Sequence, residues 1–242
     1  MMKKRKYKFN YKETVATILT ESDDFYKIAV EAILEARSEI ERYIAINPYF
    51  LISYEPFEDC FGGKVIDEMC KAAKIAKVGP MASVAGAIAG YAVEKMMENG
   101  ASLAVVENGG DIAMHSDQEI LIGLKPTNFA FLIEPKEFYS VCTSSGKISH
   151  SVSFGYADAA CVFGENAALC DALATALGNG VKESFGKDEL KKYAEEFYSE
   201  FKKYIDAIFI VKDCFLAYAG KVPEIVLVND RSSSPDLSVY PL

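Results

Sequence analysis

Several features that mark special classes of protein are missing from this sequence. No apolar run reaches the length of about 20 residues that a transmembrane helix needs. The basic cluster at residues 3–6 is not followed by the apolar core of a signal peptide, so we expect a cytoplasmic protein. The six cysteines include no Cys-x-x-Cys pair, which argues against a zinc site or a disulfide framework and favours reduced, buried thiols.

The charge balance excludes further classes. The 242 residues carry a net charge of −9, which argues against general binding of nucleic acid and against docking on an anionic membrane. Half of the residues are hydrophobic and a quarter are charged, as in a globular protein with a sizeable core. No repeat or linker interrupts the chain. We therefore predict a single domain over residues 1–230 and a poorly ordered tail over residues 231–242.

Hydrophobic periodicity predicts the elements of this domain. Helical spacing predicts helices over residues 25–46, 65–76, 81–99, 166–177 and 187–205. Alternation and short apolar runs predict strands near residues 7–11, 15–19, 101–106, 112–114, 119–124, 129–134, 138–143, 207–212, 214–219 and 224–228. Residues 47–62 are expected to be a loop with at most a short strand. Because the strands come in runs, we predict an α+β fold with packed helices and a mixed or antiparallel sheet.

The run over residues 141–180 places small polar groups between apolar segments. Asp171 and Thr175 are four residues apart on the predicted helix 166–177 and share one face. A carboxylate and a hydroxyl stacked in this way supply two oxygens to Mg²⁺, which keeps water or phosphate for its other positions. In the alternative, Thr175 bonds back to the carbonyl of residue 171 and Asp171 is solvated. The spacing alone favours this second interpretation.

Other polar positions invite both structural and functional interpretations. Gly109 and Gly110 separate two strand segments and indicate a bulge or a turn that faces a ligand, and the flanking Asn108 and Asp111 favour the turn. His150 lies among serines and indicates a polar site, whereas His115 is expected in a surface turn. Cys142 is expected to be a small buried residue rather than a nucleophile, since no basic residue is obviously placed to form a thiolate. The small residues of 81–99 imply very close packing or backbone close to a ligand.

Three segments in this order resemble the ApbE family, the FAD:protein FMN transferases. They are Val106-Glu107-Asn108-Gly109-Gly110-Asp111-Ile112, then Thr143-Ser144-Ser145-Gly146 followed by His150, and finally Asp171-Ala172-Leu173-Ala174-Thr175-Ala176. The chain as a whole is most similar to a compact microbial branch of this superfamily. The resemblance implies a single ApbE-like domain that binds FAD and Mg²⁺, cleaves the FAD pyrophosphate and attaches FMN to a threonine of an acceptor protein.

The resemblance also implies roles for individual residues. Asp171 and Thr175 would be metal ligands, and His150 a candidate general base. Two further groups would contact the flavin nucleotide and its phosphates: Asn108, Gly109, Gly110 and Asp111, and Thr143, Ser144, Ser145 and Gly146.

The sequence departs from the family pattern at two places. Ser151-Val152 follows the motif histidine where the family usually has Asp-Pro. Ala89-Gly90-Tyr91 is the nearest match to the usual Lys-Gly-Tyr, and Gly79-Pro80-Met81 is the alternative equivalent. Three functions therefore stand beside one another. They are a Mg²⁺-dependent FMN transferase or FAD pyrophosphatase, a flavin or nucleotide-binding module without chemistry, and an enzyme for another anionic metabolite on the same scaffold. A homo-oligomer is compatible with each, since the small-residue segment 79–98 suits either a core or a subunit contact.

Overall fold

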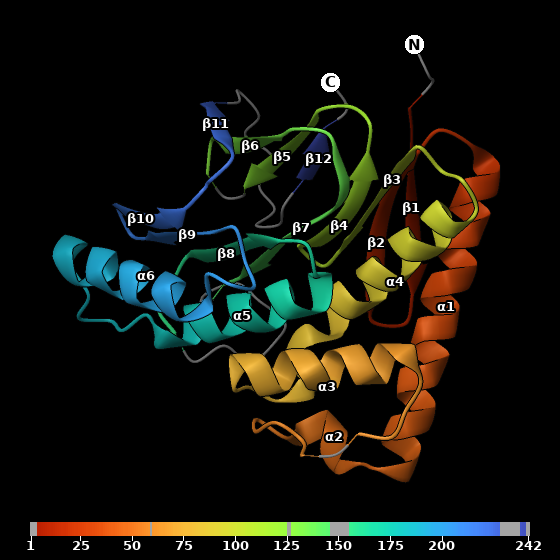
Figure 1. Cartoon of the computed structure of the whole chain (residues 1–242), viewed down its shortest axis with the longest axis horizontal. Coiled ribbons are helices and arrows are strands. Elements are labelled where there is room, and N and C mark those ends of the chain that lie inside the picture. Colours follow the sequence, from red (N-terminus) through yellow and green to blue (C-terminus); the bar gives the residue numbers. More distant parts are fainter. Residues whose placement is uncertain (1–3, 59, 125–126, 146–154, 228–237, 241–242) are drawn as a thin grey trace.

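Two antiparallel sheets and a layer of helices are stacked on one another in the computed structural model (Figure 1). The structure describes residues 4–58, 60–124, 127–145, 155–227 and 238–240. Sheet A contains, in spatial order, β1 (Arg5–Tyr11), β2 (Thr14–Thr20), β3 (Leu103–Asn108), β4 (Asp111–Ser116), β7 (Lys136–Ser144), β8 (Ala159–Gly164), β9 (Ala207–Lys212) and β10 (Phe215–Gly220). Sheet B contains β11 (Glu224–Leu227), β6 (Phe129–Ile133), β5 (Ile120–Leu124) and β12 (Ser238–Tyr240).

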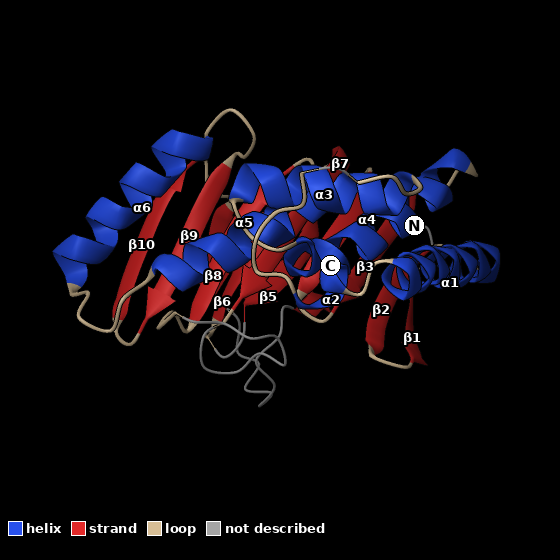
Figure 2. Ribbon diagram, turned by 90° about the horizontal axis from the view of Figure 1, so that it is seen from below, coloured by secondary structure: helices blue, strands red, loops and turns tan. Residues whose placement is uncertain are grey.

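The helices cover the face of sheet A that is turned away from sheet B (Figures 1 and 2). They are α1 (Asp23–Ile46), α2 (Tyr49–Ile52), α3 (Lys64–Ala76), the 3-10 helix η1 (Pro80–Ser83), α4 (Val84–Glu98), α5 (Ala167–Gly180) and α6 (Lys187–Phe201). Helix α4 packs on β3 and β4, α5 on β7 and β8, and α6 on β10. Helix α3 packs on α5, and α2 contacts η1.

Strand alternation builds two cores on the two faces of sheet A. In β9, Ile208 and Ile210 face the helices, whereas Phe209 faces sheet B, where its ring centroid lies 5.4 Å from that of Phe131. All six residues of β9 are buried. A strand buried on both faces reads as a continuous apolar run, which is why residues 207–212 were recognisable as a strand.

The predicted fold class is confirmed, and most predicted elements lie within a few residues of the observed ones. Helix capping agrees with the sequence as well: the Asn166 side chain accepts a hydrogen bond from the Leu169 N–H at 2.8 Å at the start of α5. Within the described ranges, none of the helices combines the length and apolar character that a bilayer-spanning helix needs.

Four expectations about elements were wrong. Residues 49–52 form the short helix α2, where the sequence suggested loop or strand, and strand β8 was missed because its small residues follow a polar stretch. Gly178-Asn179-Gly180 form the last turn of α5 instead of ending it at residue 177. Residues 238–240 of the expected tail pair with β5 as strand β12.

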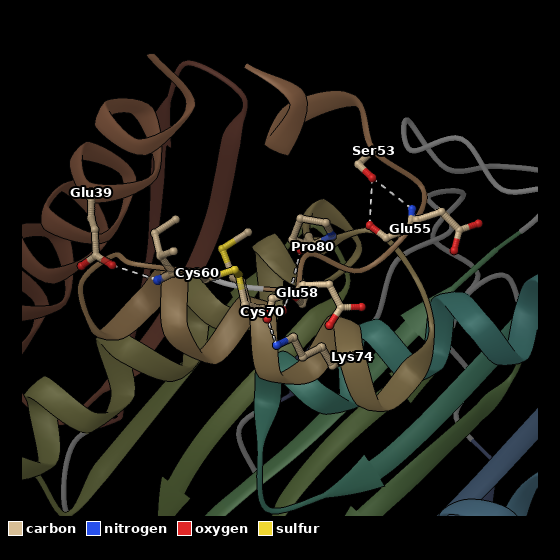
Figure 3. Close-up of a disulfide and its surroundings, with 11 residues drawn as sticks. Glu39, Ser53, Glu55, Glu58, Cys60, Cys70, Lys74 and Pro80 are labelled. Carbon is tan, nitrogen blue, oxygen red and sulfur yellow. Dashed lines mark hydrogen bonds between the residues drawn. A yellow bond between two sulfur atoms is a disulfide. The ribbon is translucent and has the colours of Figure 1, made fainter. Parts of the chain in front are cut away.

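The expectation of six reduced cysteines was also wrong. Cys60 and Cys70 form a disulfide with their Cα atoms 6.4 Å apart (Figure 3). The loop before α3 folds back along that helix and brings Cys60 to it, a contact that sequence spacing does not reveal. Cys142, Cys161 and Cys170 are free and buried as expected, and Cys214 is free and exposed.

Candidate functional site

Polar side chains from four segments converge on the helix-facing side of one end of sheet A. Asn108 and Asp111 flank the turn between β3 and β4, Ser144 ends β7, and Asp171 lies on α5. All four are less than a tenth exposed. Buried polar groups are costly unless they are paired, so their gathering here marks a candidate functional site.

The β3–β4 turn is a two-residue connection. Asn108 pairs with Asp111 across it, and Gly109 and Gly110 have φ values of 63° and 99°. Two successive positive φ angles suit a tight hairpin turn and strongly favour glycine. Gly109 and Gly110 therefore form a hairpin turn and not a bulge within one strand. Asn108 and Asp111, which flank the turn, are paired, so their side chains point to the same face of the sheet.

Those two side chains connect the turn to its neighbours. The Asn108 Nδ2 donates a hydrogen bond to the Ala85 carbonyl oxygen at 3.2 Å, near the start of α4. The Asp111 Oδ1 accepts one from the Thr143 N–H at 3.1 Å on β7. The hairpin is therefore held against both the helix start and the adjacent strand.

Asp171 lies against the N-terminus of α4. Its Oδ2 accepts a hydrogen bond from the Gly86 N–H at 2.8 Å. Amides in the first turn of a helix have no partner inside the helix and favour negative charge. Burial nevertheless raises the pKa of Asp171 to about 7, against the amides of Gly86 and Ala85, which lower it.

Gly86 makes this contact possible because α4 and α5 approach each other closely. A Cβ on Gly86 would lie 2.3 Å from the Ala167 carbonyl oxygen and 2.7 Å from the Asp171 Cβ. The small residues of this helix therefore serve close packing, one of the two meanings that the sequence allowed. Gly86 and Ala85 were not predicted as site residues, and the spacing of Gly86 and Gly90 was the available signal.

Thr175 lies one turn after Asp171 on α5 and is half-buried. Among the described residues, no group of three or more His, Cys, Asp or Glu side chains is arranged to hold a metal ion. A carboxylate that accepts hydrogen bonds from amides still keeps lone pairs for a cation, and Mg²⁺ accepts few protein ligands. The donor set therefore fits Mg²⁺ only if water or phosphate oxygens complete it, and the assignment of Asp171 and Thr175 stays a prediction.

The side chains of Thr143 and Ser144, at the end of β7, point to opposite faces of sheet A. The Ser144 side chain faces α5, where a Cβ on Gly178 would lie 3.5 Å from its Oγ. The Thr143 hydroxyl lies on the opposite face and donates to the Cys161 Sγ at 3.4 Å, so that Thr143 contributes to the site through its N–H. Ser145 follows as the last described residue of this segment. Gly146 and His150 lie outside the described residues.

Cys142 and His115 are held by packing and by contacts to backbone carbonyl oxygens. The Cys142 Sγ lies 3.5 Å from the Ala167 carbonyl oxygen, and burial raises the pKa of its thiol well above the usual value, as expected for a packed residue. His115 does not lie in a surface turn. It belongs to β4, and its Nδ1 is 2.6 Å from the Glu137 carbonyl oxygen on β7.

A cavity of about 110 Å³ lies along the α4–α5 crossing. Its walls include Gly86, Gly90 and Ala167, together with the aromatic rings of Tyr91 and Phe138. It shares Lys64, Glu94, Phe138 and Glu165 with a wider groove of about 480 Å³. Neither hollow has a lining residue from the β3–β4 turn, and the cavity meets the four polar residues through Gly86, whose N–H binds Asp171.

Comparison with known proteins identifies relatives along nearly the whole chain. A family model described as AbpE bacteria matches residues 1–205. A UPF0280 protein of Archaeoglobus fulgidus is 57% identical over 227 residues, which cover 94% of this chain and 97% of that protein. A UPF0280 protein of Methanospirillum hungatei is 39% identical over 233 residues, covering 93% and 92%.

Solved structures show the same fold at low sequence identity. The flavinyl transferase ApbE of Pseudomonas stutzeri superposes with a TM-score of 0.59 at 10% identity, covering 90% of this chain and 94% of that one. The flavin transferase ApbE of Vibrio cholerae superposes with a TM-score of 0.59 at 11% identity, covering 95% and 98%. The match of the family model and the extended identity to UPF0280 proteins together show that the chain belongs to the ApbE-like family.

Proposed function

We propose that this protein binds FAD and acts, with Mg²⁺, as an FMN transferase or FAD pyrophosphatase at the FAD pyrophosphate. The observation that carries the proposal is the burial of Asp171 at the start of α4, beside Asn108, Asp111 and Ser144. A carboxylate kept in a low-dielectric site against helix amides is costly, and bound Mg²⁺ would stabilise its charged form.

In this proposal, the chain supplies positioning and electrostatics. Asp171 and Thr175 would hold Mg²⁺, which neutralises negative charge on phosphate oxygens. The turn at Gly109 and Gly110 allows a close approach of backbone to a ligand, because a Cβ on Gly109 would meet no atom within 4 Å. Asn108 and Asp111 hold that turn rigidly against α4 and β7. His150 stays a predicted general base.

A second function is favoured by a specific contact. The hydrogen bond from the Gly86 N–H makes Asp171 resemble a structural cap of α4, which requires no metal. A flavin or nucleotide-binding module without chemistry would retain this arrangement. An enzyme for another anionic metabolite has no comparable support.

The deciding experiment is titration of the purified protein with FAD, with and without Mg²⁺, followed by chromatography for AMP and FMN. We expect binding and Mg²⁺-dependent release of AMP, and we expect Asp171→Asn to lose that release. Mg²⁺ should also raise the thermal unfolding midpoint of the wild type more than that of Asp171→Asn. The matched control is Asp188→Asn, an exposed carboxylate in the first turn of α6.

The outcomes separate the two functions. Tight binding of FAD that stays intact over long incubation with Mg²⁺ would favour the binding module. Failure to bind FAD would contradict both functions and direct the search to another ligand carried from the cell.

A further inference from the structure

The chain between the end of α1 and the start of α3 exposes many large apolar side chains. Six of them are each more than half exposed: Ile46, Tyr49, Leu51, Ile52, Tyr54 and Phe61. We call these six residues the apolar patch. Ile46 and Phe61 are 86% and 88% exposed, and five of the six fall between residues 46 and 54. Large exposed apolar patches are uncommon on monomeric proteins and commonly mark interaction sites.

The segment that carries the apolar patch is anchored from its inner side. Phe50 is fully buried, and its ring lies 4.8 Å from that of Tyr43 and 5.5 Å from that of Phe57. The Ser53 hydroxyl accepts a hydrogen bond from the Glu55 N–H at 3.1 Å (Figure 3). The patch is therefore presented by an ordered segment with an apolar inner side and an apolar outer side.

A disulfide and a hydrogen bond hold the end of the same segment against α3. Cys60 is joined to Cys70, and the Lys74 ammonium donates a hydrogen bond to the Glu58 carbonyl oxygen (Figure 3). A surface that is preorganised in this way loses little conformational entropy when it binds a partner.

The segment that carries the apolar patch touches the backbone that leads into the candidate functional site. A Cβ on Gly79 would lie 1.8 Å from the Ser53 carbonyl oxygen, so the chain just after α2 touches the backbone before η1. Helix η1 leads directly into α4, whose Gly86 N–H binds Asp171. A partner seated on the patch would therefore lie near η1, which leads to the start of α4.

The charges around the apolar patch favour a polypeptide as its partner. The described residues between 43 and 63 include no lysine or arginine, and their charged residues are Glu55 and Glu58. An anionic bilayer surface would be repelled, since such surfaces bind through clusters of basic residues. A second copy of the chain would bring the same carboxylates together. A protein segment with apolar side chains and flanking basic residues avoids both costs.

We propose that the apolar patch docks the acceptor polypeptide for flavin-nucleotide transfer. This inference rests on the proposed function. In the transfer, a hydroxyl oxygen of the acceptor forms a bond to the phosphorus on the FMN side of the FAD pyrophosphate. The bond from that phosphorus to the bridging oxygen breaks, AMP leaves with that oxygen, and the hydroxyl proton passes to a base or to solvent. Water in place of the hydroxyl yields FMN and AMP.

The test compares a triple variant of the apolar patch with a double control variant in a labelling assay. The patch variant carries Tyr49→Ser, Ile52→Ser and Phe61→Ser, and the control variant carries Leu216→Ser and Tyr218→Ser, two exposed apolar residues of β10. Each protein is incubated with FAD, Mg²⁺ and extract of the source cells, and flavin fluorescence of protein bands is read on denaturing gels. AMP release without extract is measured in parallel.

We expect the patch variant to label the acceptor band at least ten-fold less than the wild type, while the control variant labels it fully. AMP release without extract, which does not involve the patch, should be equal in all three proteins. A crosslinking amino acid at position 49 should become attached to the same fluorescent band.

Each other outcome overturns the inference in a distinguishable way. Equal labelling by the patch variant rejects the docking surface. Release of AMP by the wild type without any labelled protein rejects an acceptor and leaves a pyrophosphatase. A concentration-dependent dimer that the patch variant loses would assign the patch to a second copy, and sedimentation with phosphatidylglycerol vesicles would assign it to a membrane. Absence of FAD binding removes the proposed function itself, and the inference falls with it.

Discussion

At the residue scale, Asp171 shows how position changes the meaning of a side chain. In the sequence it is a carboxylate four residues before a threonine on a helix. In the structure it is buried against the first turn of another helix, 2.8 Å from the Gly86 nitrogen. Burial and the helix amides act on its charge in opposite directions, and burial dominates.

The pKa of Asp171 leads to a prediction about stability and pH in the absence of metal. Its pKa of about 7 in the folded protein exceeds the unfolded value of about 4, so ionisation opposes folding. The stability contributed by the protonated carboxyl is fully present below about pH 4 and is lost as the pH rises through about 7. The loss is at most about 4 kcal/mol, because one pKa unit corresponds to about 1.4 kcal/mol.

Asp171→Asn keeps an acceptor oxygen for the Gly86 N–H but cannot ionise. We therefore expect its thermal unfolding midpoint to fall less than that of the wild type between about pH 5 and about pH 8. The exposed control Asp188→Asn should follow the wild type. Parallel curves for Asp171→Asn and the wild type would show that Asp171 has an ordinary pKa.

At the element scale, the crossing of α4 and α5 determines whether the site forms. Gly86 and Gly90 are one helical turn apart and both face Ala167. The two glycines differ in how much room they leave, which makes them a matched pair.

Gly86→Ala should destabilise the protein by about 1–3 kcal/mol, as overpacking does, because its Cβ would meet the Ala167 carbonyl oxygen at 2.3 Å. Gly90→Ala should be near neutral, because its nearest neighbour is the Ala167 Cβ at 3.2 Å and alanine favours the helix by about 1 kcal/mol. Chemical denaturation measures both changes. Equal changes in the free energy of unfolding for the two variants would mean that the helices separate readily. FAD binding should be lost only in Gly86→Ala.

The disulfide gives a second prediction about elements. Reduction, or the double variant Cys60→Ser with Cys70→Ser, should lower the free energy of unfolding by about 3 kcal/mol, because the bond closes a loop with a sequence separation of 10. A reductant should lower the unfolding midpoint of the wild type and leave that of the double variant unchanged. Cys214→Ser, at an exposed free cysteine, is the control. A wild type insensitive to reductant would contradict the cross-link.

At the scale of the whole molecule, sheet A joins the helix layer to sheet B through its two buried faces. Phe131 of sheet B packs edge to face against Phe163 and Phe209 of sheet A, with centroid distances of 4.9 and 5.4 Å. We expect the two layers to unfold together, since these rings tie them into one core.

Phe131→Ala should reduce the free energy of unfolding by about 3–5 kcal/mol while keeping a single transition. Phe129→Ala, at a half-buried ring 6.5 Å from Phe209, should cost less. The chain has no tryptophan, so far-UV circular dichroism in urea is the suitable measurement. Two separate transitions in the wild type would show that sheet B is an independent unit.

Much of the fold was already determined by local patterns in the sequence. Strand β9 and helix α6 have clear periods of apolar residues, and Asn166 has the cap that its position predicts, because these features depend on neighbours along the chain. Three of the residues that the motifs singled out bind neighbouring segments: Asn108 and Asp171 bind the start of α4, and Asp111 binds β7. Their roles at a flavin nucleotide stay predictions.

Only the tertiary structure decided how these residues are used. The register of β7 directs Ser144 to the helices and Thr143 to sheet B, since strand alternation turns neighbouring side chains to opposite faces. The crossing of two helices brings the Gly86 amide to Asp171, and the fold of a loop brings Cys60 to Cys70. These contacts join residues that are far apart in the chain or that lie in a loop without a repeating pattern. Sequence spacing does not predict how close such residues are in space.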